Sequence, residues 1–190
     1  DVPYTARENA VVLPYADNPL DDEATGENVY LNMIRSAKDY VYITTPYLIL
    51  SDEMQRTLRL AASSGVDVRI ITPGIPDKKL IYQLTRSYFA PLIRAGVHVY
   101  TFTPGFLHAK TWLVDGRIAV VGSINLDYRS LYHHFECAAY LCGVPCVPDI
   151  EADFQATLAR CRRASLQTLR QEPLLRRLAG PVLKAIAPLM

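Results

Sequence analysis

The sequence predicts an α/β sandwich in which a mixed, partly parallel β-sheet carries helices on both faces. From Gly26 onward, segments with apolar residues at helical spacing alternate with short apolar runs rich in β-branched residues. This alternation is typical of helices packed against a sheet. A β-hairpin is also expected, because two apolar runs flank Asp115-Gly116, which is a strong signal for a two-residue turn.

Length and composition favour one globular domain. The 190 residues are enough for a sizeable core, and half of them are hydrophobic. We expect one folded domain over residues 1–170 and a basic, amphipathic tail over residues 171–190. The formal net charge of +1 provides no overall attraction to nucleic acid, so we expect no nucleic-acid partner. No apolar run approaches the length of a membrane span, and the opening at Asp1 without a signal peptide suggests a soluble segment of a longer protein.

The other elements can be placed in chain order. Ser51 is expected to cap a helix, because its hydroxyl can accept a backbone N–H and two acids follow it. Asp77 is expected to cap the next helix, and Pro91 to break or kink it. The expected strands cover residues 10–14, 40–45, 66–72, 97–102, 110–114, 117–121 and 135–141. The expected helix faces carry Val29, Met33 and Ala37; Met54, Leu58 and Ala61; Leu80 and Leu84; and Ile150, Phe154, Leu158 and Cys161.

The hairpin turn sets an expected register. If Asp115 and Gly116 are the only loop residues, Val114 pairs with Arg117, and the same register leads back to the open end of the hairpin. Lys110 then lies opposite Val121, and His108 opposite Ser123.

The open end of this hairpin gathers polar side chains. Side chains alternate along a strand, so His108, Lys110 and Ser123 share one face, and Asn125 follows two residues later. An imidazole, an ammonium, a hydroxyl and a carboxamide suit a phosphate oxyanion beside a nucleophile or proton carrier. Asp115 lies too far along the strand to act on that phosphate, so we interpret it as a turn and scaffold residue.

The complete spacing is more specific than any one pair. A lone H-x-K is more often a histidine and a lysine on a solvated strand end. The full pattern H-x-K-x4-D-x6-G-S-x-N needs many positions to coincide, and it resembles the motif of the phospholipase D superfamily without departure. The motif positions are His108, Lys110, Asp115, Gly122, Ser123 and Asn125.

This resemblance implies a phospholipase D-like sandwich, with residues 1–170 as a catalytic half-domain that contributes one motif to a two-motif site. In the superfamily, one motif histidine forms a phosphohistidine and a second protonates the leaving group. The chain has one motif, so the second must come from a missing N-terminal half or from a second copy in a homodimer. Carried over, His108 is the nucleophile or general acid, while Lys110, Ser123 and Asn125 hold the phosphate. Gly122, like Asp115, belongs to the motif scaffold.

Glu136 is expected to complete the catalytic set with His108 and Lys110. It lies in the apolar strand 135–141, where a carboxylate needs a partner. We expect it to pair with the His108 ring and fix its tautomer. The resemblance agrees, since the superfamily has an acid after the motif that supports the motif histidine. The alternative is an edge strand that points Glu136 to solvent.

Three other histidines carry weaker signals. His133 and His134 adjoin Glu136 and are either surface residues or part of the site lining. His98 lies within a strand pattern and is expected to be structural.

Five further segments are similar to the second half of bacterial cardiolipin synthases. They are residues 45–49, 65–70, 73–79, 85–88 and 125–130. This resemblance implies transfer of a phosphatidyl group between two phosphatidylglycerols, with release of glycerol, on the cytoplasmic side of the cell membrane. The basic tail would then be either a helix packed on its own domain or an amphipathic helix at an anionic membrane surface.

Two other functions stay open: a single-motif homodimeric phosphodiesterase or nuclease, and an isolated half that binds anions without turnover. The exposed motif face predicts a symmetric homodimer or a weakly self-associating monomer.

We expect no metal and no cofactor. The cysteines match no zinc pattern and are interpreted as reduced structural thiols, with Cys137 buried. They are Cys137, Cys142, Cys146 and Cys161.

Overall fold

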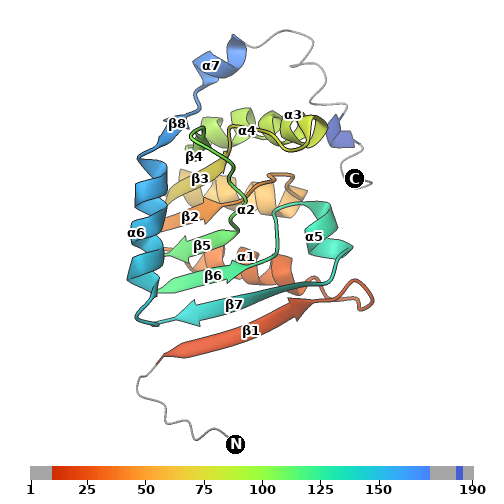
Figure 1. Ribbon diagram of the computed structural model, residues 1–190, viewed down its shortest axis with the longest axis vertical. Coiled ribbons are helices and arrows are strands. Elements are labelled where there is room, and N and C mark those ends of the chain that lie inside the picture. The colour runs from red at the N-terminus through yellow and green to blue at the C-terminus, as the bar shows by residue number, and fades with distance from the viewer. Residues whose placement is uncertain (1–9, 172–182, 186–190) are drawn as a thin grey trace, which may run out of the picture.

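A computed structural model describes residues 10–171 and 183–185 of the chain. These residues form an eight-stranded sheet with the order β1-β7-β6-β5-β2-β3-β4-β8 (Figure 1). The strands are β1 (Val11–Asp17), β2 (Tyr40–Thr44), β3 (Asp67–Pro73), β4 (His98–Phe102), β5 (Thr111–Val114), β6 (Ile118–Gly122), β7 (Glu136–Cys142) and β8 (Cys161–Arg163). The pairs β2–β3 and β3–β4 are parallel, and the other neighbouring pairs are antiparallel. The predicted mixed, partly parallel sheet is confirmed.

Helices pack on both faces of the sheet, as predicted. The helices are α1 (Thr25–Ser36), α2 (Asp52–Ser63), α3 (Lys79–Ser87), α4 (Phe89–Arg94), α5 (Tyr128–Tyr132), α6 (Val147–Leu158) and α7 (Leu166–Arg170). Helices α1 to α5 contribute buried side chains to the main core, and α6 packs against the opposite face. Strand β2 shows why both faces are covered: Val41 and Ile43 belong to the main core, while Tyr42 between them belongs to the α6 cluster.

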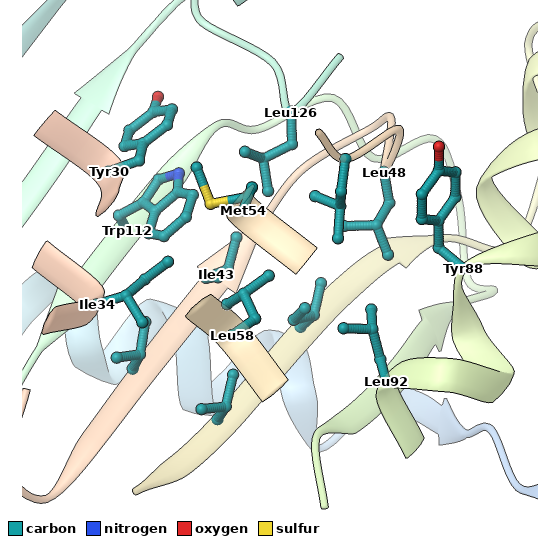
Figure 2. Close-up of a cluster of buried hydrophobic side chains, with 14 of the residues drawn as sticks. Tyr30, Ile34, Ile43, Leu48, Met54, Leu58, Tyr88, Leu92, Trp112 and Leu126 are labelled. Carbon is teal, nitrogen blue, oxygen red and sulfur yellow. The ribbon is translucent and has the colours of Figure 1, made fainter. Parts of the chain in front are cut away.

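The main core is centred on the middle strands (Figure 2). Trp112 of β5 stacks on Tyr30 of α1, with ring centroids 4.2 Å apart and planes 12° from parallel. Met54 and Leu58 of α2 lie beside Ile43, and all three are fully buried. Because this packing fixes β2 and β5 from one face, the loops that leave their ends start from rigid strands.

The hairpin register differs from the expected one by a single residue. Val114 pairs with Ile118, and Trp112 with Val120. Asp115 and Gly116 do form a tight turn, with φ of 50° and 63°, and the N–H of Arg117 bonds to the carbonyl of Val114 at 3.1 Å.

Arg117 is the residue that shifts the register. Its carbonyl accepts the N–H of Gly143 at 2.9 Å, so Arg117 is engaged by the next strand connection and acts as an extra residue before β6. The expected pairing of Lys110 with Val121 is therefore wrong, since Thr111 lies opposite Val121. The expected pairing of His108 with Ser123 is likewise wrong, because β5 begins only at Thr111.

Several local predictions can be checked. Ser51 caps α2 and accepts the N–H of Met54 at 3.1 Å, as predicted. Asp77 does not cap α3, because its carboxylate is held by the Tyr47 hydroxyl and by the N–H of Lys78. The break between α3 and α4 falls at Tyr88, and Pro91 lies inside α4.

Two cysteine predictions are wrong. Cys161 lies in β8, where it pairs with Phe102 of β4, and α6 ends before it at Leu158. Cys137 is exposed. It shares a face of β7 with Leu141, and only Leu141 reaches the cluster around α6.

Most of the expected tail lies outside the described residues. Leu183 is 9% exposed and joins the main core, and the Lys184 ammonium lies 3.9 Å from the Tyr88 ring centroid. These contacts match the alternative in which the C-terminal segment packs on its own domain. Among residues 10–171 and 183–185, no helix has the length and apolarity needed to cross a bilayer.

Candidate functional site

One end of the sheet collects the predicted site residues. Strand directions place the carboxyl ends of β2, β3, β4 and β6 at the same end as the amino ends of β5 and β7. The segments that follow β2 and β6 are tied together there, since Leu48 and Leu126 form a β-bridge and the N–H of Leu126 bonds to the Thr45 hydroxyl at 3.2 Å. The backbone of these two segments is therefore fixed, and polar side chains that are distant in the sequence lie close together at this end of the sheet.

An open cleft of about 490 Å³ lies at this end. Its lining includes every predicted catalytic, phosphate-binding and scaffold residue except Asp115, although the predicted hairpin register was off by one. These residues are His108, Lys110, Gly122, Ser123, Asn125 and Glu136. The cleft thus brings an imidazole, an ammonium, a hydroxyl and a carboxamide together, as the motif predicts.

Asp115 lies at the opposite end of β5. Its carboxylate accepts the backbone N–H groups of Lys38, Asp39 and Tyr40 at 2.9, 3.0 and 2.8 Å. Burial acts to raise the pKa of Asp115, but these three hydrogen bonds outweigh it and hold the pKa below its ordinary value. The carboxylate therefore joins the hairpin turn to the α1–β2 connection and does not reach the cleft.

Gly122 permits the close approach of β6 to β7. A Cβ atom at this position would lie 2.4 Å from the Cβ of Ala138 and 2.4 Å from the carbonyl oxygen of Cys137. Any larger residue would push the two strands apart directly before Ser123. The motif glycine is thus a packing requirement for the position of the cleft residues that follow it.

The His108 ring is held between two aromatic side chains. Phe106 stacks on it with centroids 5.4 Å apart, and Tyr47 meets it edge-on at 6.0 Å. Burial lowers the pKa of His108, and the Lys110 ammonium lowers it further. A lowered pKa favours the neutral imidazole, which keeps the nitrogen lone pair that a nucleophile or a proton acceptor requires.

Lys110 is anchored to the same segment. Its Nζ donates to the carbonyl of His108 at 2.6 Å, which leaves two N–H groups for a bound anion. Burial lowers the pKa of Lys110, while the carboxylates of Glu136 and Asp127 act to raise it. The Lys110 ammonium thus lies in the cleft near two carboxylates, while its hydrogen bond is to the backbone carbonyl of His108.

Glu136 does not pair with His108, contrary to expectation. Its carboxylate accepts a hydrogen bond from the Ser123 hydroxyl, and His134 Nδ1 lies 4.0 Å from its other oxygen. Within the described part of the chain there is no hydrogen bond between Glu136 and His108. The reason is topological: β6 lies between β7 and β5, so an acid at the start of β7 meets Ser123 first.

The alternative of a solvent-facing edge strand is also wrong. Strand β7 lies between β6 and β1, and the side chain of Glu136 is only 10% exposed. The carboxylate of Glu136 is therefore largely shielded from solvent and lies beside Ser123 in the cleft.

Asn125 is held by the short helix α5. One N–H of its amide donates to the Ser130 hydroxyl at 2.9 Å, and the backbone N–H of Ser130 donates to Asp127 at 2.8 Å. The amide oxygen of Asn125 is buried and accepts no hydrogen bond within the described residues. Asn125 thus carries an acceptor oxygen whose hydrogen-bonding capacity is unused among the described residues, and its second N–H is not taken up by Ser130.

Sequence reasoning missed two aromatic residues of the site. Tyr47 and Phe106 both contact His108, and the Tyr47 hydroxyl donates to Asp77. A signal existed for Tyr47, which lies in one of the segments that carried the resemblance, but none existed for Phe106. The sequence left the roles of His133 and His134 undecided. In the structure, His134 lines a neighbouring cavity and His133 is exposed.

His98 lies in β4 and is remote from this cleft. Its ring contacts Arg163, with Nδ1 2.6 Å from the guanidinium, and lies 3.9 Å from Asp67. These contacts are consistent with the structural role predicted for it.

Comparison with protein families and curated sequences gives consistent matches. A family model described as the PLD-like domain of cardiolipin synthase matches residues 30–158. Cardiolipin synthases of Geobacillus sp. and Halalkalibacterium halodurans are each 37% identical, over 164 and 184 residues, which are 86% and 97% of this chain. An uncharacterized protein of Streptococcus mutans is 56% identical over 182 residues, or 96% of this chain. The matched parts are 33%, 37% and 40% of those proteins, so the chain spans only a third to two fifths of these relatives.

Solved structures share the fold. Nuc from Salmonella typhimurium, described as a phospholipase D family member, superposes with a TM-score of 0.70 at 18% identity, covering 82% of this chain and 99% of that one. Phosphatidylserine synthase from Haemophilus influenzae gives a TM-score of 0.73 at 16% identity, covering 95% of this chain and 48% of that one.

Proposed function

The chain belongs to the family of PLD-like domains found in cardiolipin synthases, and from this membership we propose that it is the catalytic half-domain of a phosphatidyltransferase. The superfamily comprises enzymes that act on phosphodiesters. The finer proposal is that the chain takes part in forming cardiolipin from two phosphatidylglycerols, with release of glycerol, at the cytoplasmic side of the membrane. The observation that carries this proposal is the cleft that gathers His108, Lys110, Ser123, Asn125 and Glu136.

The geometry supports a nucleophilic role for His108. Its neutral ring, positioned by Phe106 and Tyr47, would attack the phosphorus, and the bond to the glycerol oxygen would break to leave a phosphohistidine. Lys110 and the remaining N–H of Asn125 would hold the phosphoryl oxygens. In the alternative, His108 is the general acid that protonates the departing glycerol, and the histidine of the second motif attacks the phosphorus.

A second histidine must protonate the departing glycerol. Within the described residues, His108 is the only histidine that lines the cleft. We propose that a second motif completes the site, supplied either by a further half of a longer protein or by a second copy of this chain. The first arrangement is supported by the length of the relatives, which are about two and a half to three times longer than the matched region. In either arrangement, the two motif histidines would lie on opposite sides of the phosphate.

The test is turnover of short-chain phosphatidylglycerol by the chain alone and by the chain joined to a half that bears a second motif. We expect cardiolipin and glycerol in equal amounts from the joined form, and loss of both in His108→Ala. His133→Ala is the matched control, since His133 is exposed and outside the cleft lining. Hydrolysis of bis(p-nitrophenyl) phosphate or DNA without cardiolipin would favour the phosphodiesterase alternative. Phosphate binding without any turnover would favour an anion-binding half.

Phosphate binding can be tested separately from turnover. NMR titration with inorganic phosphate or vanadate should shift the signals of Lys110, Ser123 and Asn125, and Lys110→Gln should weaken this binding about tenfold because a charge-assisted contact is lost. Shifts confined to other surfaces would contradict the proposed site.

A further inference from the structure

A second cavity of about 340 Å³ adjoins the cleft and shares Asn125 with it. Apart from Asn125, no residue of the H-x-K motif lines this cavity, so the chemistry assigned to the motif does not account for it. The side chain of Asn125 therefore borders both spaces.

The lining of the second cavity is suited to an anion. Lys78, from the connection before α3, and Arg129, from α5, contribute two cations, and neither forms an ion pair within the described residues. The Lys78 ammonium lies 5.9 Å from the Tyr47 ring centroid. Asp127 is the one acid in this lining, and its carboxylate is buried and accepts the N–H of Ser130.

The lining also has apolar and aromatic parts. Ile49, Ile81 and Tyr128 lie among the cationic side chains. A small molecule with a carbon backbone and one negative charge therefore fits this lining better than a bare inorganic ion.

Asn125 lies at the boundary of the two spaces and has an unsatisfied hydrogen-bond acceptor. Its amide oxygen is buried and has no partner within the described residues, while an N–H of the same amide is held by Ser130. A buried acceptor of this kind is satisfied by a donor such as a hydroxyl group. The order along the two spaces is therefore a phosphate site at Lys110, a hydroxyl acceptor at Asn125, and cations at Lys78 and Arg129.

We infer that the second cavity binds the headgroup of the acceptor phosphatidylglycerol, with its terminal hydroxyl at Asn125 and its phosphate at Lys78 and Arg129. This inference rests on the proposed transferase function. The acceptor headgroup carries a free hydroxyl three carbons from its phosphate, so its sequence of polar groups matches the order of the lining residues. A water molecule has no such anchor, so this cavity would favour transfer over hydrolysis.

The step that uses this cavity is the second half of the transfer. The acceptor oxygen forms a bond to the phosphorus of the phosphohistidine, and the phosphorus–nitrogen bond breaks with its electron pair returning to His108. The hydroxyl proton passes to the histidine of the second motif, which had given its proton to the departing glycerol. Cardiolipin and the free imidazole of His108 result.

The test is an NMR titration of the 190-residue chain with glycerophosphoglycerol, the soluble headgroup of phosphatidylglycerol. The signals of Ile81 and Tyr128 report on the second cavity, and those of Ser123 report on the cleft. We expect the double variant Lys78→Gln/Arg129→Gln to weaken binding at the second-cavity signals about fivefold or more. Inorganic phosphate binding at the Ser123 signal should change less than about twofold, since the Lys110 site is untouched.

Controls separate this inference from the proposed function. Lys79→Gln/Arg59→Gln removes two exposed cations that do not line the cavity, and it should leave both affinities unchanged. Dimethyl phosphate, which has the charge but no hydroxyl, should bind the second cavity more weakly than glycerophosphoglycerol. If inorganic phosphate binds at Ser123 but the double variant has no effect on glycerophosphoglycerol, the acceptor site is refuted and the phosphate site stands. If inorganic phosphate fails to shift Ser123, the proposed function fails first.

Discussion

The hydroxyl of Ser123 donates to the carboxylate of Glu136, which makes the motif serine and the following acid one hydrogen-bonded unit. The same hydroxyl oxygen accepts the backbone N–H of Cys137 at 3.0 Å, so Ser123, which follows β6, is held by the first two residues of β7. Glu136 therefore acts on the cleft by orienting Ser123 and by its charge near Lys110, and not by contact with the His108 ring.

This unit predicts energetic coupling between the two residues. In urea unfolding, Ser123→Ala and Glu136→Ala should each lower the free energy of unfolding. The double variant should lose about 1 kcal/mol less than the sum, because each single change already removes the shared hydrogen bond. Ser123→Ala combined with Ser165→Ala, a distant helix cap, should be additive. Additivity in the Ser123–Glu136 pair would mean that this hydrogen bond does not contribute to stability.

The environment of His108 predicts opposite effects from two neighbouring charges. The Lys110 ammonium lowers the pKa of His108 and the Asp77 carboxylate raises it, on top of the lowering due to burial. NMR titration of the ring protons should show a pKa below the ordinary 6.5, raised in Lys110→Gln and lowered further in Asp77→Asn. A pKa that moves in the same direction in both variants would contradict this electrostatic arrangement.

Strand and helix positions could be predicted because they depend on local periodicity. The run from Tyr40 to Thr45 is apolar on both faces, and it forms the central strand β2. The Ser51 cap was predictable for the same reason, since its acceptor lies three residues away. The motif spacing also identified the residues of the cleft, because these residues flank strands that pair in the sheet.

The errors arose where a distant segment competes for a local group. Arg117 was expected to close the hairpin ladder, but its carbonyl bonds to Gly143, which lies beyond β7. Asp77 was expected to cap its own helix, but Tyr47 holds its carboxylate. Glu136 meets Ser123 and not His108 because of the strand order. Sequence spacing contains no direct signal for any of these long-range partners.

Gly122 predicts a severe effect from the smallest possible side chain. Gly122→Ala should lower the free energy of unfolding by about 2 kcal/mol or more, because the new Cβ would clash with β7. Gly105→Ala is the matched control: an added Cβ there meets nothing within 4 Å, so the change should stay within about 0.5 kcal/mol. Chemical denaturation of both variants gives the comparison, and equal stabilities would show that β6 and β7 can separate at no cost.

Asp115 predicts a pH-dependent contribution to stability. Its folded pKa is lowered, so its stabilising contribution is present above the ordinary value of 3.8 and is lost as pH falls through the folded pKa. Asp115→Asn should therefore cost about 1 kcal/mol at pH 7, with the difference from wild type shrinking below about pH 4. Unfolding curves at pH 7, 4 and 3 test this, with Asp153→Asn on α6 as an exposed control. A difference that stays constant with pH would assign the cost to shape and not to charge.

The last prediction concerns self-association through the motif face. Phe106 is 63% exposed although it stacks on His108, and Phe135 beside Glu136 is 71% exposed. Exposed aromatic residues beside the cleft favour pairing with a second copy about a two-fold axis, which would bring two His108 residues together as the proposed two-motif site needs. We expect sedimentation equilibrium to show a dimer, or weak self-association, that Phe106→Glu reduces by about tenfold or more because a charge is buried in the contact. Leu60→Glu is the matched control, since Leu60 is 66% exposed on α2 and does not line the cleft. Self-association that persists in Phe106→Glu but is lost in Leu60→Glu would assign the contact to the helical face, and a second copy could then not supply the missing histidine.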